Sequence, residues 1–154
     1  MNDKKKTALQ VSALCNGTVI DHIPSDKVFS VVNLLGLNNI HKPITVGANL
    51  NSKKMGSKGI IKIADHYFTD SEVNKLSLIA PNIVLSTIKN YEVAGKRKIS
   101  MPDEIKGIVK CANPKCITNH EPMATRFTVV DKVNGILRCN YCNKEISIEE
   151  IKLL

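Results

Sequence analysis

Four cysteines in the last third of the chain constrain its fold more than any other feature. They form the pattern Cys111-x4-Cys116-x22-Cys139-x2-Cys142, in which two close pairs are separated by a longer excursion. This spacing is typical of a four-cysteine zinc site, because a short spacer lets one turn present two sulfur atoms to a tetrahedral ion. With all four positions filled by protein, no position remains for a reactive water molecule. The pattern therefore predicts one structural, non-catalytic Zn²⁺ per chain.

Disulfides or free thiols are the alternative interpretation of these cysteines. The chain has no apolar run of about 18 residues that could span a membrane, and we expect it to be cytoplasmic, where thiols stay reduced. His120 could replace one cysteine as a ligand, but with four cysteines available we expect it at the surface or next to the site. Cys15 is distant in sequence, and we expect it to be a small buried hydrophobic residue.

Charge and composition divide the chain into two parts. Residues 1–100 carry 14 basic and 7 acidic side chains, whereas residues 101–154 carry 8 and 7. The basic surplus of the first part favours an anionic partner such as a nucleotide or a nucleic acid. The charged segment 95–102, bounded by Gly95 and Pro102, predicts a joint. We therefore expect a basic domain at 1–100 and a zinc domain at 101–154, the latter so small that a metal commonly supplements its core.

Short patterns in the basic domain predict strands and turns. Residues 9–13 alternate apolar and polar side chains, and β character resumes at 18–20 after the turn signal Asn16-Gly17, which predicts a hairpin. The segment 51–57 is expected to be a flexible loop. Further strands are predicted at residues 44–50, 59–64, 83–88 and 91–94.

Two helices are expected between these strands. The first opens at Ser25, its predicted N-cap, and stops at Gly36. Thr69 and Glu72 form a capping-box pattern that begins the second helix, and Pro81 ends it. After the opening hairpin, this order resembles a ferredoxin-like βαββαβ unit. The predicted fold class is therefore α+β: an N-terminal ferredoxin-like α/β sandwich, with two helices on an antiparallel sheet, followed by a small all-β, zinc-ribbon-like domain.

Ionisable residues on the predicted strands are candidates for binding an anion. Lys62 lies in an apolar strand, where it either faces solvent or meets an anion, since a buried unpaired ammonium group is costly. Asp21 and His22, at a strand end, suit either an acid–base pair or a local hydrogen bond. The sequence has neither a Walker A pattern nor a G-x-G-x-x-G run, which excludes the P-loop and Rossmann types of nucleotide site.

Several segments resemble those of aspartate carbamoyltransferase regulatory chains. The likeness is carried, together with the cysteine spacing, by Gly17–Pro24, Lys58–Ile63, Ala80-Pro81, Asn90–Lys96 and Cys139–Cys142. These segments follow in the right order and extend the likeness over nearly the whole chain. The resemblance implies a regulatory subunit in pyrimidine biosynthesis that is not itself an enzyme, the activity lying on a separate catalytic chain.

The resemblance further implies that the basic domain binds CTP, ATP and UTP as allosteric effectors at one shared site. Main-chain groups near Val11, Ala13 and Leu14 would recognise the base, and lysine side chains would hold the phosphates. At Ser86 the chain departs from the family pattern, in which an Asn is expected. The implied nucleotide-binding residues are Val11, Ala13, Leu14, Val19, Asp21, His22, Lys62, Ser86, Tyr91, Val93 and Lys96.

The resemblance also implies a quaternary structure. Two regulatory chains would pair through their allosteric domains, and three such dimers would bridge two catalytic trimers into a dodecamer. Each zinc domain would hold a catalytic chain through Asn113 and Lys115, in the loop between the first two cysteines. Lys115 departs from the neutral amide expected there. Neither a nucleic acid nor a membrane is expected as a partner.

Two other functions fit parts of the sequence. A zinc-ribbon protein that binds nucleic acid would explain the net charge of +8, but the chain has only three Phe and three Tyr to stack on bases. Once it holds Zn²⁺, the zinc domain would also have a net charge near zero, which argues against nucleic-acid binding. A small enzyme using Asp21, His22 and Lys62 would need a paired nucleophile and base, which the spacing does not supply.

Overall fold

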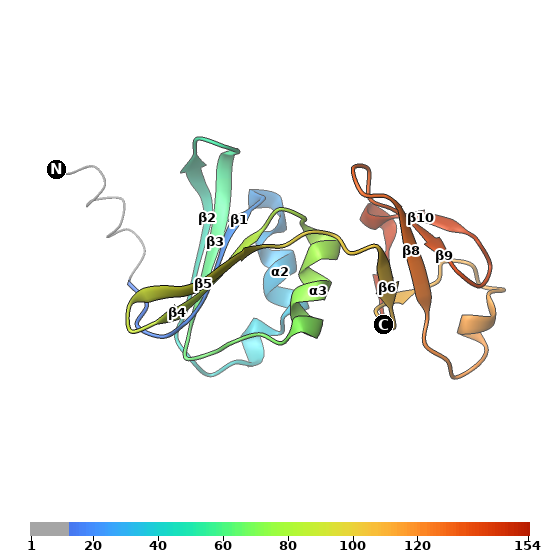
Figure 1. The fold of residues 1–154 in the computed structure, drawn as a ribbon, viewed down its shortest axis with the longest axis horizontal. Coiled ribbons are helices and arrows are strands. Elements are labelled where there is room, and N and C mark those ends of the chain that lie inside the picture. Colours follow the sequence, from blue (N-terminus) through green and yellow to red (C-terminus); the bar gives the residue numbers. More distant parts are fainter. Residues whose placement is uncertain (1–12) are drawn as a thin grey trace. The chain divides into compact units, whose positions relative to one another are not determined.

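Two units make up the chain, and the boundary between them falls between Ser100 and Met101 (Figure 1). The computed structural model describes residues 13–154. Of the strand predicted at residues 9–13, only Ala13 lies within the described residues, and it is not part of a strand. No helix in this described part is long and apolar enough to cross a membrane.

A five-stranded antiparallel sheet forms the framework of the first unit. It lies in the order β2-β3-β1-β4-β5, and every neighbouring pair is antiparallel. The first four strands have the order of a ferredoxin-like sheet, and β5 extends the sheet beyond β4. The strands are β1 (Gly17–Ile23), β2 (Ile44–Ser52), β3 (Gly56–Ala64), β4 (Val84–Lys89) and β5 (Glu92–Lys98).

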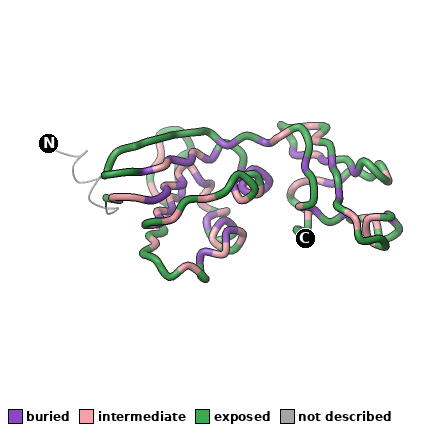
Figure 2. The backbone as a smooth tube through the Cα atoms, turned by 60° about the horizontal axis from the view of Figure 1, so that its bottom comes forward, coloured by how far each residue is buried: buried purple, intermediate pink, exposed green. Residues whose placement is uncertain are grey.

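Two helices, α2 (Val28–Leu34) and α3 (Asp70–Ile79), cover one face of this sheet (Figure 1). The core between helices and sheet is aliphatic, and Ile20, Ile61 and Leu76 are among its fully buried members. In contrast, all seven residues of β5 are exposed (green in Figure 2). The ferredoxin-like α/β sandwich predicted from the sequence is confirmed.

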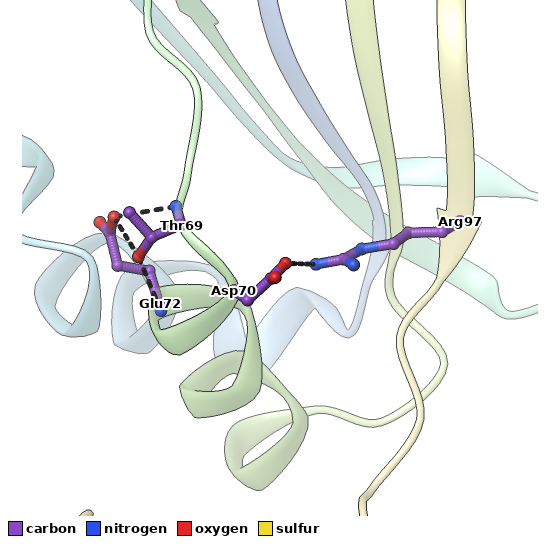
Figure 3. A network of polar contacts seen from close by, with 4 residues as sticks. All are labelled: Thr69, Asp70, Glu72 and Arg97. Carbon is purple, nitrogen blue, oxygen red and sulfur yellow. Dashed lines mark hydrogen bonds and ion pairs between the residues drawn. The ribbon is translucent and has the colours of Figure 1, made fainter.

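The capping pattern predicted for the second helix is present (Figure 3). Thr69 Oγ1 accepts a hydrogen bond from the main-chain N–H of Glu72 at 3.3 Å, and Glu72 Oε1 accepts one from the N–H of Thr69 at 3.1 Å. This reciprocal pair satisfies two main-chain donors that a helix start leaves free. Gly36, with φ of 62°, lies just beyond α2 as the predicted stop.

The N-cap predicted at Ser25 is wrong. Ser25 begins a short 3₁₀ turn, η1 (Ser25–Lys27), and α2 starts only after it. The Ser25 hydroxyl donates to Ser57 Oγ at 3.0 Å instead of capping a helix. The Ser25 hydroxyl is thus bonded to Ser57 of β3, which is distant in sequence, and not to a main-chain N–H of a helix start.

Two segments predicted to be irregular are partly strand. β2 and β3 continue into the segment 51–57 through the pair Asn51 and Ser57, leaving only a short turn between them. The predicted joint at 95–102 also begins as strand, because Lys98 still pairs with Val84 of β4. Both extensions consist of polar, solvent-facing residues, which a strand at a sheet edge tolerates without apolar alternation.

The second unit is all β within residues 101–154 except for short 3₁₀ turns, as predicted. Its main sheet has the order β10-β9-β8-β6, and β7 pairs with β11 in a separate ribbon. Phe127 and Leu137 are buried at its centre. The elements are β6 (Glu104–Lys106), β7 (Val109–Lys110), η3 (Ile117–Asn119), β8 (Arg126–Asp131), β9 (Ile136–Cys139), β10 (Glu145–Ser147), η4 (Ile148–Glu150) and β11 (Lys152–Leu153).

Candidate metal centre and ligand-binding face

The four cysteines of the predicted metal site meet in the second unit. Cys111 follows β7 and Cys116 precedes η3, whereas Cys139 ends β9 and Cys142 lies in the turn before β10. All four Sγ atoms lie within 4.8 Å of one another. The Sγ atoms of Cys111 and Cys142 are 3.6 Å apart, and those of Cys116 and Cys139 are 3.8 Å apart. None of the four forms a disulfide.

These separations fit four thiolates around one tetrahedral ion. Ligands at about 2.3 Å from Zn²⁺ lie about 3.8 Å from one another, whereas a disulfide needs a sulfur separation of about 2.05 Å. Burial raises the pKa of the Cys111 thiol to about 12. Burial, the largest single effect, opposes ionisation of Cys142, but hydrogen bonds from the main-chain N–H of Lys144, from Asn113 and from the neighbouring cysteines together outweigh it and lower the pKa of Cys142 to about 7. Four clustered sulfurs can ionise together only beside a cation, which a divalent metal supplies.

Short polar contacts shape the loop between the first two cysteines. Asn113 Oδ1 accepts from the main-chain N–H of Lys115 at 3.0 Å, and Asn119 Nδ2 donates to the main-chain oxygen of Asn113 at 2.8 Å. Lys115 itself is exposed. His120 is not part of the sulfur cluster, because its Nε2 lies 2.8 Å from the main-chain oxygen of Pro114. The expected contact of Asn113 and Lys115 with a partner chain stays a prediction.

In the first unit, one cross-strand row gathers four of the predicted nucleotide residues. Val19 of β1 pairs with Lys62 of β3 on one side and with Ser86 of β4 on the other. Ser86 in turn pairs with Lys96 of β5. Directly opposed residues of antiparallel strands point to the same side. Since the neighbouring Ile20 is buried under the helices, this row lies on the face of the sheet that the helices leave uncovered.

A bulge in β5 brings Val93 to the same face. Val93 and Lys96 are three residues apart and would face opposite sides of a regular strand. However, Ile88 pairs with Val93 while Ser86 pairs with Lys96, so β5 holds one more residue than β4 between these pairs. The extra residue is a β-bulge, and it turns both Val93 and Lys96 onto the uncovered face.

Asp21 lies two residues along β1 from Val19, on the same face. Its Oδ1 is 2.9 Å from Nζ of Lys58 on β3. Burial, the largest single effect, opposes ionisation of Asp21, but the hydrogen bonds from Lys58 and from the main-chain N–H of His22, together with the charge of Lys58, outweigh it, so the pKa of the Asp21 carboxyl is lowered. Burial lowers the pKa of Lys62, an effect that the nearby Asp21 charge opposes. Lys58 is a candidate site residue that the sequence analysis missed, although it opens one of the segments that carry the family resemblance.

His22 occupies an irregular point of β1. Its φ of 58° coincides with a shift in the register between β1 and β3. The main-chain N–H of His22 donates to Asp21 Oδ1 at 2.6 Å, which is the local hydrogen bond considered from the sequence. The ring does not pair with this carboxylate: within residues 13–154, Nδ1 is buried without any hydrogen-bond partner.

A hollow of about 240 Å³ adjoins the row, and Lys62 lines it. Ala13, Leu14 and Tyr91 also line it, which brings three more predicted nucleotide residues to one place. Tyr91 is held in the turn between β4 and β5, where its N–H donates to the main-chain oxygen of Cys15 at 2.8 Å. Cys15 is only half-buried and lines the same hollow, so its expected role as a buried hydrophobic residue is wrong. Val11 lies outside the described residues.

We call this surface the ligand face, comprising Val19, Asp21, Lys58, Lys62, Ser86, Val93 and Lys96 with the adjoining hollow. The named residues carry three lysines and one aspartate, and Asp65 also lines the hollow, so the remaining net charge of +1 favours an anion. The hollow offers apolar side chains and main-chain groups at one end. The face is thus suited to a ligand with a planar, weakly polar part and a strongly anionic part.

Comparison with known proteins bears on both units. Residues 9–100 match the family model described as the allosteric domain of the aspartate carbamoyltransferase regulatory chain. Residues 103–152 match the model described as the metal binding domain of the same chain. The two matches together span nearly all of the sequence.

Individual relatives that align with this chain over nearly their full length carry the same name. The chain is 62% identical over 154 residues to the aspartate carbamoyltransferase regulatory chain of Phocaeicola vulgatus, covering 100% of this chain and 99% of the relative. Identity to the same protein of Bacteroides fragilis is 59% over 151 residues, covering 98% and 99%. The Pyrococcus horikoshii protein is 43% identical over 145 residues, covering 93% and 95%.

Proposed function

The chain belongs to the family of aspartate carbamoyltransferase regulatory chains, and from this premise we propose that it binds CTP, ATP and UTP as effectors, holds a structural Zn²⁺ and bridges catalytic trimers in the cytoplasm. Its allosteric domain would correspond to residues 1–100 and its metal-binding domain to residues 101–154. As a regulatory chain it is not itself the enzyme.

The observation that most supports nucleotide binding is the row of Lys62, Val19, Ser86 and Lys96 beside the hollow. Lysines bind phosphate groups as adaptable point charges, and Lys62 and Lys96, which lie at opposite ends of the row, would contact different parts of an extended nucleoside triphosphate. The hollow would take the base, because main-chain N–H and C=O groups can distinguish an amino from an oxo substituent.

Zinc is the metal that the cysteine cluster favours. Four thiolates with no oxygen or nitrogen ligand select a soft or borderline ion, and a closed tetrahedral set gives it a structural role. In this proposal the ion supplies folding energy, and the loop carrying Asn113 and Lys115 is shaped by the cysteines at its two ends. That loop would contact the catalytic chain, and loss of the ion would release the catalytic trimers.

Regulation in this proposal is a shift between two arrangements of the domains. A nucleotide shifts the equilibrium between the two arrangements only by the difference between its binding free energies for them. Such coupling free energies are typically about 1–3 kcal/mol. We expect CTP to inhibit and ATP to activate.

Calorimetric titration of CTP and ATP into the zinc-loaded chain tests the nucleotide proposal. Lys96→Ala should abolish measurable binding of both. Arg97→Ala is the matched control, because it removes the same charge from the next residue of β5, whose side chain faces α3 and pairs with Asp70 at 3.5 Å (Figure 3). Equal losses in the two variants would indicate general charge attraction rather than a site on the ligand face. No saturable binding to the unaltered chain would refute the proposal.

A further inference from the structure

A second hollow, of about 400 Å³, lies in the metal-binding domain beside the ribbon of β7 and β11. Lys110 and Lys152 both line it, and they are direct partners in the register of the two strands. Residues so paired have Cβ atoms about 5 Å apart on the same side of the ribbon, and like charges at this spacing destabilise the pairing. The ribbon therefore presents two lysine side chains to one hollow.

In the part of the chain that the structure describes, no carboxylate neutralises this pair. Among residues 13–154, neither Lys110 nor Lys152 forms an ion pair. Glu150 also lines the hollow but is not bridged to either lysine. The two lysines and one glutamate leave a positive balance. An unneutralised cationic pair beside a cavity is the arrangement that a bound oxyanion stabilises.

Two other polar side chains of the wall are held by contacts of their own. Asn119 Nδ2 donates to the main-chain oxygen of Cys111 at 3.1 Å, and His120 Nε2 lies 2.8 Å from that of Pro114. These side chains are therefore committed to the loop around the cysteines. The two lysines are the cationic groups of the wall that remain available for a ligand.

We propose that this hollow is an anion site, in which the ammonium groups of Lys110 and Lys152 together hold one oxyanion, either phosphate or carboxylate. It is distinct from the ligand face of the allosteric domain and does not depend on the nucleotide proposal. The occupant is either a free anion or a carboxylate side chain of the catalytic chain. In both cases, the two lysines that pair across β7 and β11 bind an oxyanion.

The first test titrates inorganic phosphate into the full-length, zinc-loaded chain, read from the NMR amide signals of Lys110 and Lys152. These signals separate this hollow from lysines of the allosteric domain. We expect saturable shifts, and at least a tenfold weaker affinity in Lys110→Ala and in Lys152→Ala. The matched control is Lys106→Ala, an exposed lysine of the same domain on β6. Unchanged affinity in both hollow variants would overturn the free-anion form of the proposal.

A second variant distinguishes ligand binding from mere strand packing. Lys152→Glu replaces the like-charged pair with an opposed ion pair across β7 and β11. The melting temperature of the metal-binding domain should therefore rise in phosphate-free buffer and no longer respond to added phosphate. In the unaltered chain, phosphate should raise it. A phosphate response that persists in Lys152→Glu would contradict the assignment.

The last arm identifies the source of the oxyanion by measuring association with catalytic trimers. If a carboxylate of the catalytic chain occupies the hollow, Lys110→Ala and Lys152→Ala weaken association at least tenfold and phosphate competes with it. If a free anion occupies the hollow, association is unchanged while phosphate still binds. Absence of phosphate binding together with unchanged association would refute the site altogether.

Discussion

Gly59 offers a direct test of how β3 and α2 fit together. A Cβ at this position would lie 2.0 Å from Val28 Cγ2 and 3.2 Å from the main-chain oxygen of Gly47. Val28 is fully buried at the start of α2, so its side chain cannot turn into solvent. Gly59→Ala should therefore destabilise the allosteric domain by about 1–3 kcal/mol, the usual cost of overpacking a core.

A double-mutant cycle isolates this contact. Val28→Ala alone removes two buried methyl groups and should cost about 2 kcal/mol. It also removes the atom that clashes, so the double variant should be more stable than the sum of the single effects by about 1–2 kcal/mol. Gly95→Ala is the control, because a Cβ there meets nothing within 4 Å, and its effect should stay within about 0.5 kcal/mol.

The assay is urea-dependent hydrogen exchange of the buried β1 amides in the zinc-loaded chain. These amides report on the allosteric domain alone, which matters because a two-domain chain need not unfold in one step. Strict additivity of the two substitutions would refute the reasoning, since it would mean that Gly59 and Val28 do not share a packing constraint.

Three further predictions follow from single features of the structure. Removing the metal with a chelator should unfold residues 101–154 while the β1 amides stay protected; a folded metal-free domain in NMR spectra would contradict this. Thr69→Ala should cost the allosteric domain about 1 kcal/mol in urea unfolding, and Thr69→Ser should restore it. Because the pKa of Asp21 is lowered in the folded state, the ionised carboxylate stabilises the fold at pH values above its ordinary pKa of 3.8. This stabilisation is lost as pH falls through the folded-state pKa. Asp21→Asn should therefore remove part of the acid-induced loss of β1 protection, and an unchanged pH profile would argue against the Lys58 contact.

Features whose partners are close in sequence could be predicted. The capping box joins Thr69 and Glu72, which are three residues apart, and each cysteine pair is presented by one short turn. The interactions that decide these structures are local. The ferredoxin-like order of strands and helices could also be predicted, because the helix and strand patterns alternate along the chain and leave few ways to bury their apolar faces.

Features that depend on strand register could not be predicted. The Ser25 hydroxyl has Ser57 within reach only because η1 lies beside β3. The ion pair between Lys58 and Asp21 likewise requires the pairing of β1 with β3. The bulge at Ala94, which alone allows Val93 and Lys96 to share a face, has only a weak sequence signal in the adjacent Gly95.

The position of β5 explains how a nucleotide on the ligand face could influence the rest of the molecule. Along one strand, adjacent residues face opposite sides, so Lys96 lies on the ligand face while Arg97 pairs with Asp70 at the start of α3. This exposed pair contributes little energy, and β5 is held chiefly by its ladder with β4. The anchoring continues to Ile99, which is buried and whose N–H donates to the Ile83 oxygen at 2.7 Å. Because this anchoring extends almost to the domain boundary, we expect a nucleotide of the proposed kind to act without loosening β5. In that proposal, a change of domain arrangement would occur in the few residues that follow Ile99.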